Sequence, residues 1–189
     1  DSTLDAHLSP LQTHYIDGPV TLTNNGHTIQ ASEPADTRDT ITLDKQTWTL
    51  QQFHFHSPSE NTVHGKKYAM EMHLVHKNAA GELTVVAVMF DKGAANPELE
   101  KLWSVMPQLA EQNVSIKGDL NLNTLLPEDK TYFRFSGSLT TPPCSEGVTW
   151  IVLKHPMTVS AEQLDKFTHT MHHDNNRPVQ SLHGRVVVE

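Results

Sequence analysis

The feature that most constrains this sequence is the alternation of aromatic and histidine side chains in Gln52-Phe-His-Phe-His56. Side chains alternate faces along a β-strand, so His54 and His56 project from one side while the two phenylalanines bury on the other. A second apolar run, Glu71-Met-His-Leu-Val75, carries His73. If these two strands pair, three imidazoles converge on one point.

Three histidines without a fourth protein ligand are the ligand set of an open, catalytic zinc site. A closed structural site would want a fourth ligand and usually cysteines, and this chain has one cysteine. The histidines of such a site need acceptors behind their rings. Gln52 points to the same face as His54, and Glu71 to the same face as His73. Glu60 lies in a turn-like stretch and could orient a hydroxyl group near the metal.

The remaining pattern predicts a β-rich fold. Asn24-Asn-Gly26 favours a type I′ turn in the first hairpin. Helices are predicted over 98–112, which Pro107 should kink or interrupt, and after Ser160, which begins a capping box. The predicted strands are 20–23 with 27–30, 41–43 with 47–56, 68–77 with 83–91, and 132–139 and 148–153.

These elements predict one domain over residues 1–189, mainly β with peripheral helices, on a large twisted, mostly antiparallel central sheet. A net charge of −8 and a pI near 5.9 argue against nucleic acid or an anionic membrane as a partner. No apolar run approaches the roughly 20 residues of a membrane span. We therefore expect small molecules as partners, while dimerisation stays open.

Several segments, in order along the chain, resemble the α-class carbonic anhydrases of the bacterial, secreted type. The longest is Ser59-Glu-Asn-Thr-Val-His-Gly-Lys-Lys-Tyr-Ala-Met-Glu-Met-His-Leu-Val75. The others are Asn24-Asn-Gly-His27, Gln52-Phe-His-Phe-His56, Ser138-Leu-Thr-Thr-Pro-Pro143, Val148-Thr-Trp-Ile-Val-Leu153 and Asn175-Asn-Arg-Pro178. The resemblance implies reversible hydration of carbon dioxide to bicarbonate and a proton. Zinc hydroxide would attack the substrate at the base of a conical cleft.

The resemblance also implies roles for individual residues. The zinc (Zn2+) ligands would be His54, His56 and His73. Gln52, Glu71 and the backbone of Asn175 would lie behind their rings.

Two hydroxyl-orienting groups and a proton carrier follow from the same resemblance. Thr140 would accept a hydrogen bond from the hydroxide and donate its own hydroxyl hydrogen bond to Glu60. His27 lies at the family's proton-shuttle position. An imidazole titrating near neutral pH suits that task. The substrate pocket would be formed by Val75, Val85, Leu139, Thr141, Val148 and Trp150, with Asn25 and Gln30 beside Thr141 on its wet wall.

Family members normally carry a few dozen residues before the point at which this sequence starts. In secreted forms that segment includes a cysteine that forms a disulfide with the cysteine at the position of Cys144. We therefore expect a disulfide in a longer form of the protein and a periplasmic or extracellular location.

Two other interpretations stay open. His54-x-His56-x-x-x-Glu60 also fits the first half of a cupin motif, in which the glutamate binds iron or manganese. No Gly-rich segment ending in Pro-x-Gly with a following histidine matches the second half. The second interpretation is a non-catalytic binding module, since carbonic anhydrase-like domains that have lost a zinc histidine serve as adhesion or ligand-binding domains. All three histidines, Glu60 and Thr140 are present, which speaks against it.

Overall fold

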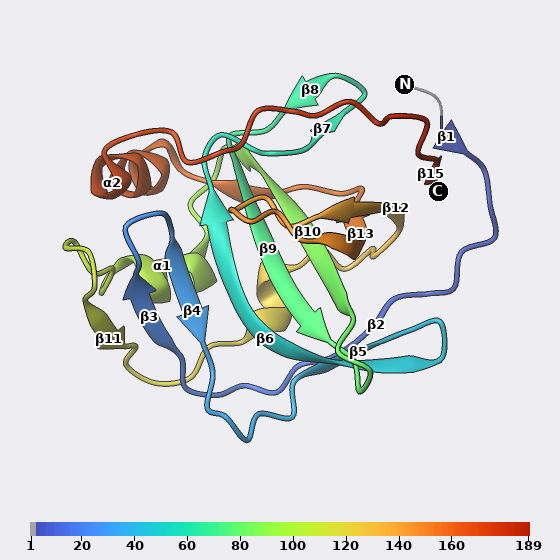
Figure 1. Ribbon diagram of the computed structural model, residues 1–189. Helices are drawn as coiled ribbons and strands as arrows, with labels where there is room; N and C mark the ends of the chain where they lie inside the picture. Colours follow the sequence, from blue (N-terminus) through green and yellow to red (C-terminus); the bar gives the residue numbers. More distant parts are fainter. Residues whose placement is uncertain (1–2) are drawn as a thin grey trace.

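A computed structural model describes residues 3–189 as one large twisted sheet with two α-helices packed outside it (Figure 1). Thirteen strands belong to this sheet, and a small hairpin of two strands lies apart from it. The strands of the described part are β1 Thr3–Leu4, β2 Gln12–His14, β3 Thr21–Asn24, β4 Ile29–Ser32, β5 Thr40–Leu43, β6 Gln46–His56, β7 Thr62–Val63, β8 Lys66–Lys67, β9 Met70–Lys77, β10 Leu83–Lys92, β11 Asn113–Ser115, β12 Tyr132–Ser138, β13 Glu146–Leu153, β14 Met157–Val159 and β15 Val187–Val188.

The main path through the sheet runs β1-β15-β12-β13-β10-β9-β6-β4-β3-β11. Most neighbours are antiparallel, whereas β1–β15, β10–β13 and β10–β14 are parallel. The long strands β6, β9 and β10 lie side by side at its centre (Figure 1). The predicted mainly-β class and mostly antiparallel sheet are confirmed.

Each face of the sheet buries its own apolar cluster. The larger cluster takes Phe53 and Phe55 of β6 and packs against α1 (Pro97–Trp103) and α2 (Ala161–Met171). Phe55 meets the ring of Trp103 edge to face at 4.9 Å, which ties the sheet to α1. The smaller cluster lies on the opposite face, to which the histidines of β6 also point.

The first predicted helix is wrong in length, because α1 ends at Trp103 instead of reaching residue 112. Pro107 explains this difference: it has no N–H to donate, and its ring would clash with the carbonyl of Trp103 four residues earlier. The second helix begins as predicted, with both hydrogen bonds of the capping box formed between Ser160 and Gln163. A short 3₁₀-helix, Leu122–Leu125, was not predicted.

The first hairpin also differs from the prediction. Its strands end at Asn24 and resume at Ile29, so the loop has four residues and is not a two-residue type I′ turn. The asparagine side chains explain the longer loop: Asn24 Oδ1 accepts from Gly26 N, and Asn25 Oδ1 accepts from His27 N and Thr28 N.

Among the described residues, neither α-helix has the length and apolar character that a membrane span requires.

Candidate metal centre

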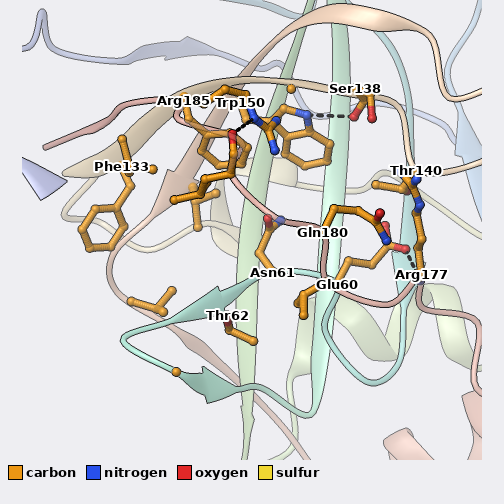
Figure 2. Close-up of a pocket in the computed structure, with 18 of the residues that line it drawn as sticks. Glu60, Asn61, Thr62, Phe133, Ser138, Thr140, Trp150, Arg177, Gln180 and Arg185 are labelled. Atoms are coloured by element: carbon orange, nitrogen blue, oxygen red, sulfur yellow. Dashed lines mark hydrogen bonds between the residues drawn. The ribbon is translucent and has the colours of Figure 1, made fainter. Parts of the chain in front are cut away.

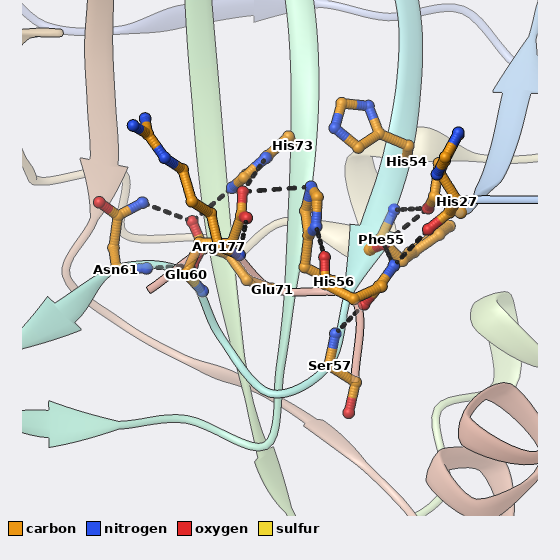
Figure 3. Close-up of polar contacts among 12 residues, drawn as sticks. His27, His54, Phe55, His56, Ser57, Glu60, Asn61, Glu71, His73 and Arg177 are labelled. Carbon is orange, nitrogen blue, oxygen red and sulfur yellow. Dashed lines mark hydrogen bonds and ion pairs between the residues drawn. The ribbon is translucent and has the colours of Figure 1, made fainter. Parts of the chain in front are cut away.

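Pairing of β6 with β9 brings the three predicted histidines together. His54 lies directly opposite His73 in the antiparallel register, and His56 lies opposite Glu71. The ring centroids of His56 and His73 are 4.7 Å apart, and those of His54 and His56 are 5.0 Å apart. Figure 3 shows the three rings grouped on one face of the sheet.

Each ring is oriented by an acceptor behind it. His54 Nδ1 bonds Gln52 Oε1 at 2.7 Å, and His56 Nδ1 donates to the backbone carbonyl of Asn175 at 3.0 Å. His73 uses its other nitrogen, Nε2, to donate to Glu71 Oε2 at 2.5 Å. In each case the second ring nitrogen is left free to face the centre of the group.

The three histidines form a compact set of candidate metal ligands. One ligand atom from each histidine lies within 4.8 Å of the others. His56 Nε2 is buried without a hydrogen-bond partner among the described residues, although buried nitrogens normally have one. Burial and the other two imidazoles lower the pKa of His54, and burial lowers that of His56 to about 3. Both rings are therefore neutral at pH 7, as metal ligands must be.

The Glu60 carboxylate lies beside this donor set. Its Oε1 is 3.3 Å from His56 Nε2 and 3.8 Å from His73 Nδ1, while Oε2 accepts from Arg177 N at 2.6 Å. Burial raises the pKa of Glu60, and His73, a hydrogen bond from Thr140 and the Arg177 amide oppose that rise. The Thr140 side chain therefore lies near the Glu60 carboxylate, as the predicted hydroxyl-orienting pair would require.

Two partners in this region were missed at the level of sequence. The amide of Arg177 holds Glu60, and Asn61 donates twice to Glu71, from its backbone and from its side chain. No spacing rule links these residues to the histidines. Both residues lie in segments that resemble the family, 59–75 and 175–178, but no role was predicted for either.

His27 lies on the exposed loop between β3 and β4, next to the His54 side of the group (Figure 3). Asn175 attaches this loop to the centre, because its Nδ2 donates to the carbonyls of His27 and Phe55. Its Oδ1 accepts from Ser57 N at 2.8 Å. One asparagine therefore holds the loop of His27, the end of β6 and the ring of His56.

An apolar wall adjoins the centre on the same face. Val75 lies opposite Val85, which in turn lies opposite Trp150. The indole of Trp150 meets the His73 ring edge to face at 4.9 Å. Of the other predicted pocket residues, Val148 is buried in the same cluster, Leu139 packs against it, and Thr141 is exposed on the following turn.

A pocket of about 580 Å³ opens beside this wall, on the side of Glu60 and Thr140 (Figure 2). Phe133 and Trp150 form its apolar part, and Arg177 forms part of its polar edge. The three histidines do not line this pocket. The predicted conical cleft directly above them stays a prediction.

Comparison with known proteins agrees with this geometry. The family model for eukaryotic-type carbonic anhydrase matches residues 1–189. A carbonic anhydrase of Klebsiella pneumoniae is 70% identical over 189 residues, which are 100% of this chain and 77% of the relative. The α-carbonic anhydrase of Thermovibrio ammonificans, solved with sulfanilamide, superposes with a TM-score of 0.95 at 47% identity, covering 99% of this chain and 82% of that one. That of Photobacterium profundum gives 0.94 at 48% identity, covering 100% and 86%.

The fold and the three-histidine group define a protein of the carbonic anhydrase class. The chain belongs to the eukaryotic-type carbonic anhydrase family, and it is a carbonic anhydrase enzyme. The cupin interpretation is therefore wrong.

Proposed function

We propose that the protein binds zinc through His54 Nε2, His56 Nε2 and His73 Nδ1 and catalyses reversible hydration of carbon dioxide to bicarbonate and a proton. The observation that carries the proposal is the donor set. Each ring has one nitrogen held by an acceptor, so its other nitrogen is directed at its neighbours within 4.8 Å. Three imidazoles with no further protein ligand suit an open zinc site.

Zinc held in this way lowers the pKa of a coordinated water and so supplies hydroxide near neutral pH, a behaviour for which carbonic anhydrase itself is the standard example. The residues around the centre have separate tasks. Glu60 is placed to accept a hydrogen bond from the Thr140 hydroxyl, which would leave the Thr140 oxygen to accept one from the attacking hydroxyl group and orient it. Val75, Val85 and Trp150 give carbon dioxide an apolar surface beside His73.

His27 carries the proton away after each turnover. Its side chain is exposed, so it can exchange protons with buffer, and its loop is held to the centre by Asn175. An imidazole can give and take a proton near neutral pH without a large barrier. The rival function, a binding module without catalysis, would not require this exposed imidazole.

The deciding experiment is stopped-flow hydration of carbon dioxide by the zinc-loaded protein, the chelated protein and His73→Ala, with zinc counted in each sample. We expect one zinc per chain and fast hydration in the first sample only. Stoichiometric zinc without hydration would instead favour the binding module. Tight zinc in His73→Ala would overturn the ligand assignment.

We also propose a periplasmic or extracellular location. The support is the resemblance of the Thr-Pro-Pro-Cys144 segment to secreted family members, in which this cysteine is half of a disulfide. Cys144 is partly exposed, and no second cysteine lies within this sequence to pair with it. Thiol titration of the protein isolated from its native compartment tests this: a free Cys144 there would contradict the proposal.

A further inference from the structure

The carboxylate of Glu71 is fixed by four hydrogen bonds at a fully buried position. Its Oε1 accepts from the backbone amides of Glu60 and Asn61, at 2.9 and 2.8 Å. Its Oε2 accepts from Asn61 Nδ2 at 2.6 Å and from His73 Nε2 at 2.5 Å. Glu71 has no exposed surface, so water does not replace any of these donors.

One of the four donors depends on the identity of a side chain outside the histidine group. The two backbone amides would be present with almost any residue at positions 60 and 61. The Asn61 side chain, by contrast, donates to the same oxygen that receives His73 Nε2. It therefore sets the position of Oε2, and Oε2 sets the orientation of the His73 ring.

The same short loop also places Glu60. Asn61 follows Glu60 directly, and the Glu60 carboxylate lies 3.8 Å from His73 Nδ1. Asn61 attaches this loop to Glu71 on β9. It thereby helps to position the groups on both sides of the His73 ring: the Glu71 carboxylate at Nε2 and the Glu60 carboxylate near Nδ1.

We propose that Asn61 is a positioning residue of the metal centre, whose side-chain amide holds Glu71 against His73 and so slows the release of zinc. This inference rests on the proposed function, in which His73 is a zinc ligand. Partners one step behind a metal ligand typically change metal affinity roughly 10- to 100-fold when they are removed. Asn61 acts one step further back, through Glu71.

The test is the rate of zinc release into excess dipicolinate from the zinc-saturated protein. Asn61→Leu and Asn61→Asp both remove the amide donor, and the aspartate has nearly the size of the asparagine. We expect either variant to release zinc roughly 10-fold faster, the lower end of the range for outer-shell partners. Asn61→Gln keeps an amide donor on a partly exposed side chain and should restore much of the slow release.

A control removes side-chain hydrogen bonds away from the histidine group. In the turn between β9 and β10, Asn78 Nδ2 donates to Glu82 Oε1 at 2.9 Å and to Gln46 Oε1 at 3.1 Å, and Asn78 Oδ1 accepts from the backbone amides of Ala80 and Glu82. Asn78→Leu should leave zinc release unchanged, so a faster rate confined to the Asn61 variants separates positioning from a general loss of stability.

The two proposals fail in different ways. If His73→Ala loses its zinc while Asn61→Leu and Asn61→Asp release zinc at the wild-type rate, the role of Asn61 is overturned and the zinc site stands. If His73→Ala keeps stoichiometric zinc, both are overturned.

Discussion

His54 and His73 lie directly opposite each other on β6 and β9, and their rings meet edge to face with centroids 5.3 Å apart. This pairing continues across the sheet, with Gln30 on the other side of His54 and Ala87 on the other side of His73. A slip of one residue in the β6–β9 register would turn the side chains of one strand to the opposite face and so separate His73 from His54 and His56. The metal centre is therefore only as well defined as the pairing of the two central strands.

Replacing Thr140 with alanine should leave zinc bound but slow hydration. The hydroxyl lies near Glu60 and, in the proposed mechanism, orients the attacking hydroxyl group, so its loss removes that orientation and leaves the histidine acceptors intact. A loss of orientation of this kind costs on the order of 100-fold in rate. Stopped-flow hydration with parallel metal analysis measures both quantities. Thr124→Ala, which removes an exposed hydroxyl on the 3₁₀-helix, is the control, and an unchanged rate in Thr140→Ala would remove this residue from the mechanism.

Replacing His27 with alanine should lower kcat in weak buffer and leave kcat/KM nearly unchanged. In the proposed mechanism it removes a proton after the chemical step, so its loss limits turnover only when buffer cannot take over. Added imidazole should restore kcat. The exposed His155, which pairs with Asp129, provides the control variant His155→Ala. If imidazole makes no difference to His27→Ala, another group carries the proton.

Stability should fall between about pH 4.5 and pH 7 through Glu33. Burial, followed by a hydrogen bond with Asp39, raises the pKa of Glu33 from 4.5 to about 7. The folded protein thus keeps a proton that the unfolded chain releases above pH 4.5, so this contribution to the free energy of unfolding decreases as pH rises to about 7 and is constant above that.

Urea unfolding of wild type and Glu33→Gln across this range isolates that contribution, because glutamine does not titrate. The wild-type curve should lose stability relative to the variant between pH 4.5 and pH 7. Parallel curves would show that Glu33 titrates alike in the folded and unfolded states.

Gly137→Ala should destabilise the protein by about 1–3 kcal/mol through overpacking. A Cβ atom at this position would lie 2.8 Å from Trp150 Cδ1 and 3.3 Å from the ring of Phe135. The indole cannot move aside freely, since its Nε1 donates to the Ser138 carbonyl at 3.0 Å. Urea unfolding measures the change. In Gly18→Ala the new Cβ meets nothing closer than 3.9 Å, so equal losses in the two variants would rule out a specific clash with Trp150.

The donor set could be predicted from sequence because its signals are local. Strand alternation alone places His54 and His56 on one face with Gln52, and the same rule places Glu71 beside His73. The two central strands were also recognisable from their apolar runs. Their bounds in the structure differ from the predicted bounds by only one or two residues.

The parts of the site that were not predicted depend on contacts between residues far apart in sequence, which no local rule describes. Arg177 N reaches Glu60 across 117 residues of sequence, and the Asn61 amide finds Glu71 only because the loop after β6 turns back over β9. The prediction of a type I′ turn at Asn25 was wrong for a related reason: hydrogen bonds from backbone amides to the Asn25 side chain outweighed the preference of Asn-Gly for a tight turn.

The bond from His56 Nδ1 to the carbonyl of Asn175 spans 119 residues, and this has a consequence for biosynthesis. A ribosome that has made β6 and β9 has already made all three imidazoles. The acceptor that orients one of them does not yet exist, nor does the side chain that holds the loop of His27. The histidine group is therefore completed only after translation has passed Asn175, and before that point the His56 ring lacks the acceptor that orients it.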